Sequence, residues 1–279
     1  MTAKKTAKAT RKTAKQDQAP GLSREQITEV MRILKDVNSV ELKLVAPMET
    51  HRATVRKLRV DPIEAEIRQA YFFDTPNLDL SKAGVVVRAR RIQGGGGDTV
   101  VKLRPVDPAA IDRELRRSAS FKTEVDAVPG GFVCSGSFKG RCTAQEVLEA
   151  VEGKAPLDRL FSKEQRAFYR AHAPKGLSLG SLATFGPTFV LKTRQWVKQL
   201  NRRLVVEMWL FPDGSRNLEI STKCEPSEAF QVAQETKAYL QGMGIDLTGN
   251  QQSKTRAAME FFGPEVRQVA RKRKTRRPT

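Results

Sequence analysis

Charged side chains occupy every second position in several short stretches of the chain, and apolar residues lie between them. Three of these stretches carry two cations each, in Val-Val-Arg-Ala-Arg (86–90), Val-Val-Lys-Leu-Arg (100–104) and Val-Leu-Lys-Thr-Arg (190–194). Successive side chains of a β-strand point to opposite faces, so the pattern predicts strands with one charged and one apolar face. The charged faces of several such strands would line one common surface of a sheet.

Strand patterns dominate the chain from residue 66 onward, and one strand precedes them. Eight strands are predicted, at 39–46, 67–74, 84–92, 99–104, 121–127, 188–197, 202–211 and 217–224. The glycine run 94–97 predicts a hairpin turn, since glycine adopts positive φ without cost, and Asp213-Gly214 predicts another. No Gly-Lys-Ser/Thr follows the glycine run, which excludes a phosphate-binding P-loop there.

Five segments show helical periodicity or start signals. Ser23 is the expected N-cap of the first, and Gln26 completes a capping box ahead of apolar residues at helical spacing. The predicted helices are 24–37, 52–60, 143–152, 158–172 and 226–242. Because helices are gathered between and after the strands and no repeat is visible, the pattern favours an α+β fold with one domain at 23–263.

Basic residues are concentrated at the two ends of the chain. The sequence has 279 residues, with 50 Lys and Arg against 31 Asp and Glu, and a formal net charge of +19. Residues 1–22 and 264–279 are rich in Lys and Arg and lack apolar periodicity, so both are predicted to be disordered basic tails. Such tails either attract polyanions without specificity or act only as solubilising extensions.

The remaining composition limits the setting of the protein. Three cysteines share no Cys-x-x-Cys spacing, which is typical of a reduced compartment. No apolar run approaches the length of a membrane span, and the N-terminal region lacks the apolar core of a secretory signal. We therefore expect a cytoplasmic protein without membrane contact, and the sequence leaves its oligomeric state open.

Basic and acidic residues alternate with apolar residues in separate stretches of the chain, and this separation indicates the candidate chemistry. Acidic pairs alternate in the same way as the cationic pairs, as Glu124 and Asp126 show. Two histidines and unspaced cysteines disfavour a nitrogen or sulfur metal site, whereas carboxylates suit Mg²⁺ or Mn²⁺. An ordinary exposed sheet face is the alternative, but paired cations on one strand repel each other unless an anion lies between them. The pattern favours a polyanion with bound divalent metal.

Residues 71–90 carry a longer motif. Tyr-Phe-Phe-Asp-Thr-Pro-Asn-Leu-Asp-Leu at 71–80, followed by Ala-Gly-Val-Val-Val-Arg-Ala-Arg at 83–90, resembles the signature of the CYTH superfamily, the triphosphate tunnel metalloenzymes. The resemblance covers about residues 38–262. It implies an eight-stranded antiparallel β-barrel closed into a tunnel, with peripheral helices. It also implies metal-dependent hydrolysis of a triphosphate or polyphosphate substrate, for which we expect inorganic tripolyphosphate.

The resemblance also implies roles for individual residues. The substrate phosphates would be bound by Lys43, Arg88, Arg90, Lys102, Arg104, Arg194, Lys223 and Lys254. Mg²⁺ or Mn²⁺ would be held by Glu41, Glu124, Asp126, Glu207 and Glu219. Lys192 would act as the catalytic base for the attacking water, because Arg194 and the metal would lower its pKa.

Three positions depart from the family pattern. Ser39 replaces the first glutamate of the opening Glu-x-Glu-x-Lys motif, Ser221 replaces a late carboxylate, and Trp209 stands where an aspartate is common. Fewer carboxylates weaken metal binding. Two alternatives therefore stay open: a catalytically weakened module that binds polyphosphate or nucleotide phosphates, and an adenylate cyclase of the class IV type.

Overall fold

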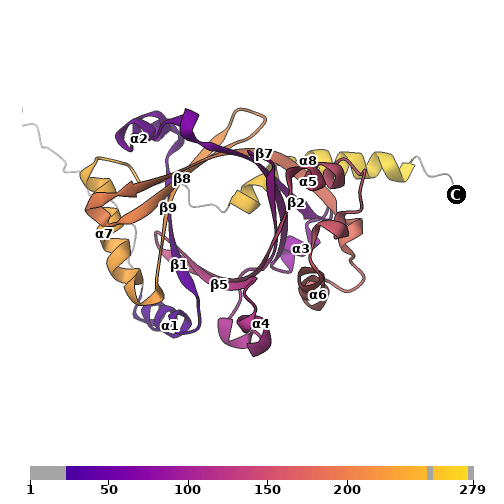
Figure 1. Ribbon diagram of the computed structural model, residues 1–279, viewed down its shortest axis with the longest axis horizontal. Helices are drawn as coiled ribbons and strands as arrows, with labels where there is room; N and C mark the ends of the chain where they lie inside the picture. Colours follow the sequence, from indigo (N-terminus) through magenta and orange to yellow (C-terminus); the bar gives the residue numbers. More distant parts are fainter. Residues whose placement is uncertain (1–22, 250–253, 276–279) are drawn as a thin grey trace, which may run out of the picture.

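The computed structural model describes residues 23–249 and 254–275, and nine strands of this part form a closed barrel (Figure 1). Around the barrel the strands follow the order β1-β5-β6-β4-β3-β2-β7-β8-β9. Their bounds are β1 Ser39–Ala46, β2 Glu66–Asp74, β3 Val85–Ile92, β4 Gly96–Leu103, β5 Phe121–Val128, β6 Gly131–Thr143, β7 Ala183–Val197, β8 Arg202–Leu210 and β9 Arg216–Cys224. The predicted closed barrel is confirmed, but the predicted number of eight strands is wrong.

The strand missing from the prediction is β6. Its sequence is rich in glycine and serine, so it lacks the charged and apolar alternation that marks the other strands. The small residues are required by close packing. A Cβ on Gly140 would lie 2.5 Å from Thr99 Oγ1 and 2.6 Å from Gln165 Oε1, and one on Gly136 would lie 2.9 Å from the Phe121 ring. β6 therefore fits between its neighbours because it carries glycine at these positions.

One strand pair departs from the predicted antiparallel arrangement. β1 runs parallel to β5, with Ser39 opposite Glu124 and Glu41 opposite Asp126. On its other edge β1 is antiparallel to β9, where Glu41 lies opposite Lys223. This parallel pair closes the barrel, and it places the acidic positions of β1 and β5 side by side.

Eight α-helices of the described chain surround the barrel, with α5 and α6 on one side and α7 on the opposite side (Figure 1). They are α1 Arg24–Leu34, α2 His51–Lys57, α3 Asp79–Lys82, α4 Arg113–Arg117, α5 Ala144–Val151, α6 Lys163–His172, α7 Ala229–Gly242 and α8 Lys254–Thr275. The Ser23–Gln26 capping box is present at the start of α1. No helix in the described ranges is long and apolar enough to cross a membrane.

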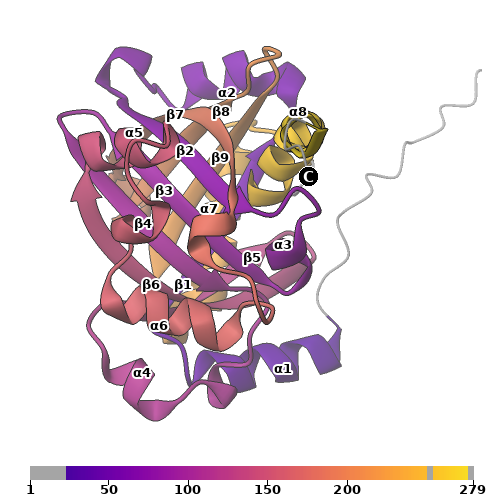
Figure 2. The same ribbon diagram turned by 90° about the vertical axis from the view of Figure 1, so that its right-hand side faces the viewer.

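Helices α5 and α6 lie over the outside of the barrel (Figure 2), and apolar side chains of the strands pack beneath the surrounding helices. Beneath α5 and α6, Phe121 and Phe138 form a buried aromatic cluster with Phe168, with ring centroids 5.0–5.6 Å apart. Beneath α1 and α7, Val30 and Val232 pack with residues of β1 and β5. Burial of each such side chain contributes about 1.5–3 kcal/mol, and it fixes which strand face is left to point inward.

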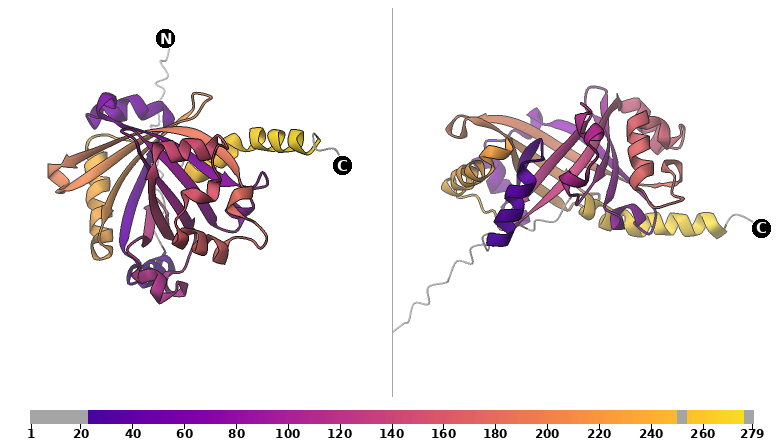
Figure 3. Two further views of the ribbon diagram at one scale, coloured as in Figure 1. Left: turned by 45° about the vertical axis from the view of Figure 1, so that its right-hand side comes forward. Right: turned by 90° about the horizontal axis from the view of Figure 1, so that it is seen from below.

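α8 differs from the sequence prediction of a disordered tail at 264–279. The helix continues through Pro264 to Thr275, and its second half projects beyond the barrel (Figure 3). Ala258, Met259 and Phe262 anchor the helix against buried residues such as Phe72 and Trp209. This packing stabilises the helix past a residue that usually ends one. Residues 1–22 and 276–279 of the predicted tails lie outside the described residues.

Candidate functional site

The inward faces of the barrel strands line a cavity of about 1700 Å³. Twelve Lys and Arg residues and seven Asp and Glu residues contribute to its wall. The predicted site residues among them are Glu41, Lys43, Arg88, Arg90, Lys102, Arg104, Glu124, Lys192, Glu207, Glu219, Lys223 and Lys254. Side chains from distant parts of the chain therefore meet in one predominantly cationic space.

Two predicted residues do not line this cavity. Arg194 lies further along β7, where its side chain is 38% exposed and its guanidinium is 3.6 Å from Glu66. Asp126 is almost fully buried behind the lining, and its carboxylate contacts Lys43 at 2.8 Å and Arg104 at 3.0 Å. Arg194 therefore lies apart from the predicted phosphate-binding residues of the cavity. Asp126 does not line the cavity itself but forms ion pairs with two cations that do, Lys43 and Arg104.

Other charged residues of the cavity were missed by the sequence analysis. Asp98 lies two positions before Val100, on the same face of β4 as Lys102, so extending the predicted strand toward the glycine run would have found it. Lys139 and Arg141 belong to β6, which was not predicted. They line the cavity opposite Val100 and Asp98.

The Asp-Thr-Pro motif organises the turn that leads into β3. Asp74 is fully buried, and its carboxylate accepts hydrogen bonds from the backbone N–H groups of Thr75, Leu80 and Ser81 at 2.7–2.9 Å. Burial raises the pKa of Asp74, although these backbone donors oppose the shift. The motif therefore has a structural role: it holds α3 in place and sets the start of the strand that carries Arg88 and Arg90.

One wall of the cavity contains two well-formed ion pairs. Arg90 lies opposite Asp98 and donates to it from Nε at 2.9 Å and from Nη2 at 2.5 Å. Lys192 donates to Glu207 at 2.7 Å, and the indole N–H of Trp209 donates to the same carboxylate at 3.2 Å. Burial opposes ionisation of Glu207, but Lys192 and Lys254 lower its pKa to about 2. Trp209, which stands in place of an expected aspartate, therefore helps to fix Glu207.

Arg88 and Lys102 are the least neutralised of the predicted cations in the wall. Arg88 is 3.7 Å from Asp98, and its Nε is buried without a hydrogen-bond partner in the described structure. Burial, with nearby Arg90, lowers the pKa of Arg88 to about 9. Lys102 is 3.9 Å from Asp126, and burial lowers its pKa to about 8. An anion between these side chains would provide the charge and the acceptor that both lack.

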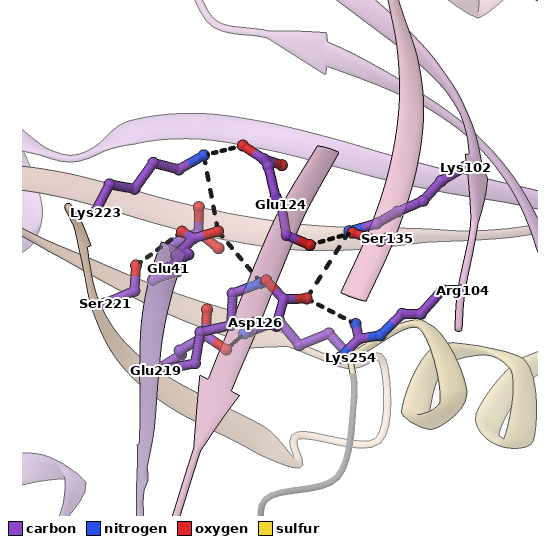
Figure 4. A network of polar contacts seen from close by, with 12 residues as sticks. Glu41, Lys102, Arg104, Glu124, Asp126, Ser135, Glu219, Ser221, Lys223 and Lys254 are labelled. Atoms are coloured by element: carbon purple, nitrogen blue, oxygen red, sulfur yellow. Dashed lines mark hydrogen bonds and ion pairs between the residues drawn. The ribbon is translucent and has the colours of Figure 1, made fainter. Parts of the chain in front are cut away.

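The part of the wall formed by β1, β5 and β9 is an acidic cluster tied to lysines (Figure 4). Lys223 contacts Glu124, and Lys254 contacts Glu219. Glu41 accepts from the Ser221 hydroxyl at 3.3 Å and lies 3.4 Å from Lys43. The pKa values of Glu124 and Asp126 are about 2, because the surrounding cations outweigh the effect of burial. These carboxylates are ionised and already paired.

The arrangement does not fit a divalent metal ion. Within the described ranges no three His, Cys, Asp or Glu side chains come together closely enough to hold one. Each of the five predicted metal ligands instead lies within 4 Å of a lysine, as shown by Glu41–Lys43, Glu124–Lys223, Asp126–Lys43, Glu207–Lys192 and Glu219–Lys254. Ser39 and Ser221 reduce the acidic charge, so the remaining carboxylates are matched by the protein's own cations.

Two solved structures resemble the barrel. One is an adenylyl cyclase candidate from Hippeastrum that is described as having a dominant triphosphatase activity; it matches with a TM-score of 0.60 and 14% identity, over 80% of this chain and 96% of its own. The other, from Bacillus halodurans, carries the provisional name adenylate cyclase, with a TM-score of 0.54 and 15% identity over 78% and 96% of the two chains. No protein-family model and no curated protein sequence matches the chain. At these identities the likeness supports the CYTH-like tunnel fold alone.

Proposed function

We propose that the barrel binds a linear triphosphate inside its cavity and hydrolyses a phosphoanhydride bond, with inorganic tripolyphosphate as the substrate. The observation that carries this proposal is the pair of poorly neutralised cations, Arg88 and Lys102, in the wall of the barrel cavity. A triphosphate carries several negative charges and many acceptor oxygens, which match guanidinium and ammonium groups. Cations already paired with Asp or Glu line the cavity around the anion.

Hydrolysis is the reaction for which the cavity is best suited. Phosphoryl transfer depends mainly on positioning and on neutralising charge, so it needs no covalent nucleophile. Lys192 is the residue we propose as the base for water. Burial lowers its pKa and so favours the neutral amine, which can accept a proton from water, although Glu207 opposes this shift; the 2.7 Å hydrogen bond to Glu207 positions the amine. The triphosphatase activity described for the Hippeastrum protein is consistent with such a reaction on this fold.

Binding without turnover is the second candidate. It is favoured by the pairing of all five predicted metal ligands with lysines, which leaves none of these five carboxylates free to recruit a metal. A protein of this kind would retain triphosphate or the phosphates of a nucleotide without cleaving it.

One assay separates these possibilities. Phosphate release from tripolyphosphate is measured with Mg²⁺, with Mn²⁺ and with EDTA, and cyclic AMP formation from ATP is measured in parallel. We expect Lys192→Ala to lower phosphate release by about a hundredfold while tripolyphosphate is still bound. Lys175→Ala, which changes an exposed lysine away from the cavity, is the control. Binding without phosphate release in all three buffers would favour the second candidate, and absence of binding would refute both.

A further inference from the structure

We infer that Lys43 occupies the position of a divalent cation in the acidic wall of the cavity, so that triphosphate binding is independent of divalent metal. This inference rests on the proposed function and specifies how the site neutralises its ligand. It follows from three observations: the carboxylates around Lys43, the lysines that occupy the remaining acidic groups, and the neutral residues at two further positions.

The first observation is that Lys43 lies among carboxylates from three strands. Its ammonium is 2.8 Å from Asp126 on β5 and 3.4 Å from Glu41 on β1. Glu219 on β9 adds a third negative charge. It lies two positions before Ser221, the residue of β9 that is paired with Lys43. The side chain is therefore a fixed positive charge inside an acidic cluster.

The second observation is that the neighbouring carboxylates also have protein cations. Arg104 lies 3.0 Å from the second oxygen of Asp126, Lys254 contacts Glu219, and Lys223 contacts Glu124. A metal ion entering this cluster would have to displace charge-assisted hydrogen bonds, and it would add two positive charges beside several others. Entry of a metal is therefore disfavoured by the side chains that surround the position.

The third observation concerns the chemistry at two neighbouring positions. Ser39 lies opposite Glu124, and Ser221 lies opposite Lys43 and donates its hydroxyl to Glu41. A carboxylate at either position would add negative charge to the cluster, and a metal ion would then be needed to balance it. With serine at both, Lys43 and its neighbours are sufficient. Since Lys43 also lines the cavity, its ammonium is available to a bound phosphate oxygen.

The test measures anion and metal binding separately on the full chain. Titration calorimetry with tripolyphosphate is performed in EDTA and in Mg²⁺ at equal ionic strength, and we expect the two Kd values to agree within about threefold. Tripolyphosphate itself binds Mg²⁺, so metal binding to the protein is measured in a separate experiment without tripolyphosphate. In that experiment Mn²⁺ is titrated into the protein and its electron paramagnetic resonance signal is recorded. We expect no stoichiometric Mn²⁺ site in the wild-type protein.

Substitution of Lys43 provides the second arm. Lys43→Met should weaken tripolyphosphate binding in EDTA by about tenfold or more, through loss of a charged donor, and should create Mn²⁺ binding at the freed carboxylates. Lys43→Arg keeps the charge and should remain without a Mn²⁺ site. Lys122→Met, at a cavity-lining lysine outside the acidic cluster, is the matched control and should leave Mn²⁺ binding absent.

The outcomes distinguish this inference from the proposed function. Tripolyphosphate binding that weakens by more than about tenfold in EDTA, or a stoichiometric Mn²⁺ site in the wild-type protein, overturns the role of Lys43 but leaves a triphosphate-binding tunnel intact. Absence of tripolyphosphate binding in both buffers overturns the proposed function. Failure of folded Lys43→Met to bind Mn²⁺ contradicts the inference, and a thermal melt of that variant establishes whether it is folded.

Discussion

Arg88→Met should change ligand affinity and protein stability in opposite directions. The guanidinium of Arg88 is 3.7 Å from Asp98, and its Nε is buried without a hydrogen-bond partner in the described structure. The empty protein therefore carries an unfavourable buried charge at this position, and the bound anion relieves it. Methionine fills a similar length of space without a charge or a donor.

The expected loss of affinity follows from the contacts that an anion would make. A guanidinium can donate two hydrogen bonds to one phosphate group, and a charge-assisted hydrogen bond contributes about 1.5–3 kcal/mol. Removing Arg88 is expected to reduce the free energy of tripolyphosphate binding by about 3 kcal/mol, because part of each contribution is offset by the cost of desolvating the ion pair. This corresponds to an increase in Kd of about a hundredfold.

The expected gain in stability follows from the group left unpaired. A buried donor without a partner costs about 1–3 kcal/mol, so its removal should raise the free energy of unfolding by about 1 kcal/mol or more. Arg90→Met is the matched control on the same strand. Arg90 donates to Asp98 at 2.9 and 2.5 Å, and its removal leaves a half-buried carboxylate with weaker pairing, so stability should fall.

Calorimetric titration with tripolyphosphate and urea denaturation measure the two quantities on each variant. If Arg88→Met lowers the free energy of unfolding as Arg90→Met does, then Arg88 is a structural residue and the reasoning fails. An unchanged tripolyphosphate affinity in Arg88→Met would also refute the proposed role of Arg88, because the anion would then be bound elsewhere.

Three further predictions follow from individual side chains. The pKa of Lys102 is about 8, so its ammonium is lost as the pH rises from about 7 to about 10, and tripolyphosphate affinity should fall over that range. Lys102→Arg should remove this pH dependence. Calorimetric titrations across the same pH range measure both affinities. The pKa of Glu207 is lowered from 4.5 to about 2, so the stability that this carboxylate adds is complete above about pH 4.5 and is lost toward pH 2. Glu207→Gln should therefore cost about 3 kcal/mol near neutral pH and flatten the acid limb of a stability profile, and an unchanged acid limb would contradict the assignment. Asp74→Ala removes the acceptor of three backbone N–H groups and should lower the free energy of unfolding, measured by urea denaturation, by about 3 kcal/mol. An effect below about 1 kcal/mol would show that Asp74 does not stabilise this turn.

Most of the barrel could be predicted from the sequence because its strands carry a strong alternating pattern. Charged residues on one face and apolar residues on the other identify β3, β4 and β7 directly. β6 has no such pattern, since Gly136 and Gly140 are selected by close contact with neighbouring side chains. Likewise, α8 continues through Pro264 because Phe262 and the residues before it are anchored on the barrel, and that anchoring is tertiary.

The sequence predicted which residues line the site better than it predicted which of them form ion pairs with one another. The alternation within a strand shows which side chains share a face, and thus indicated that Lys43, Arg88 and Lys192 point the same way as their alternating neighbours. Which carboxylate each cation meets depends on the register between strands far apart in the chain. Glu41 lies beside Asp126 and Lys223 only because β1 joins β5 and β9, and no local pattern specifies that choice.

The position of β1 between β5 and β9 has a kinetic consequence. Residue Val40 hydrogen-bonds through its carbonyl to Cys224, which follows it by 184 positions, so the ring of strands cannot be completed until almost the whole described chain has been synthesised. Contacts of such large sequence separation slow folding, because the entropy of the intervening chain is lost before the pairing is gained. Until then β1 and β8 present open edges, which are prone to intermolecular pairing, and any shortening of the chain before β9 would make that exposure permanent.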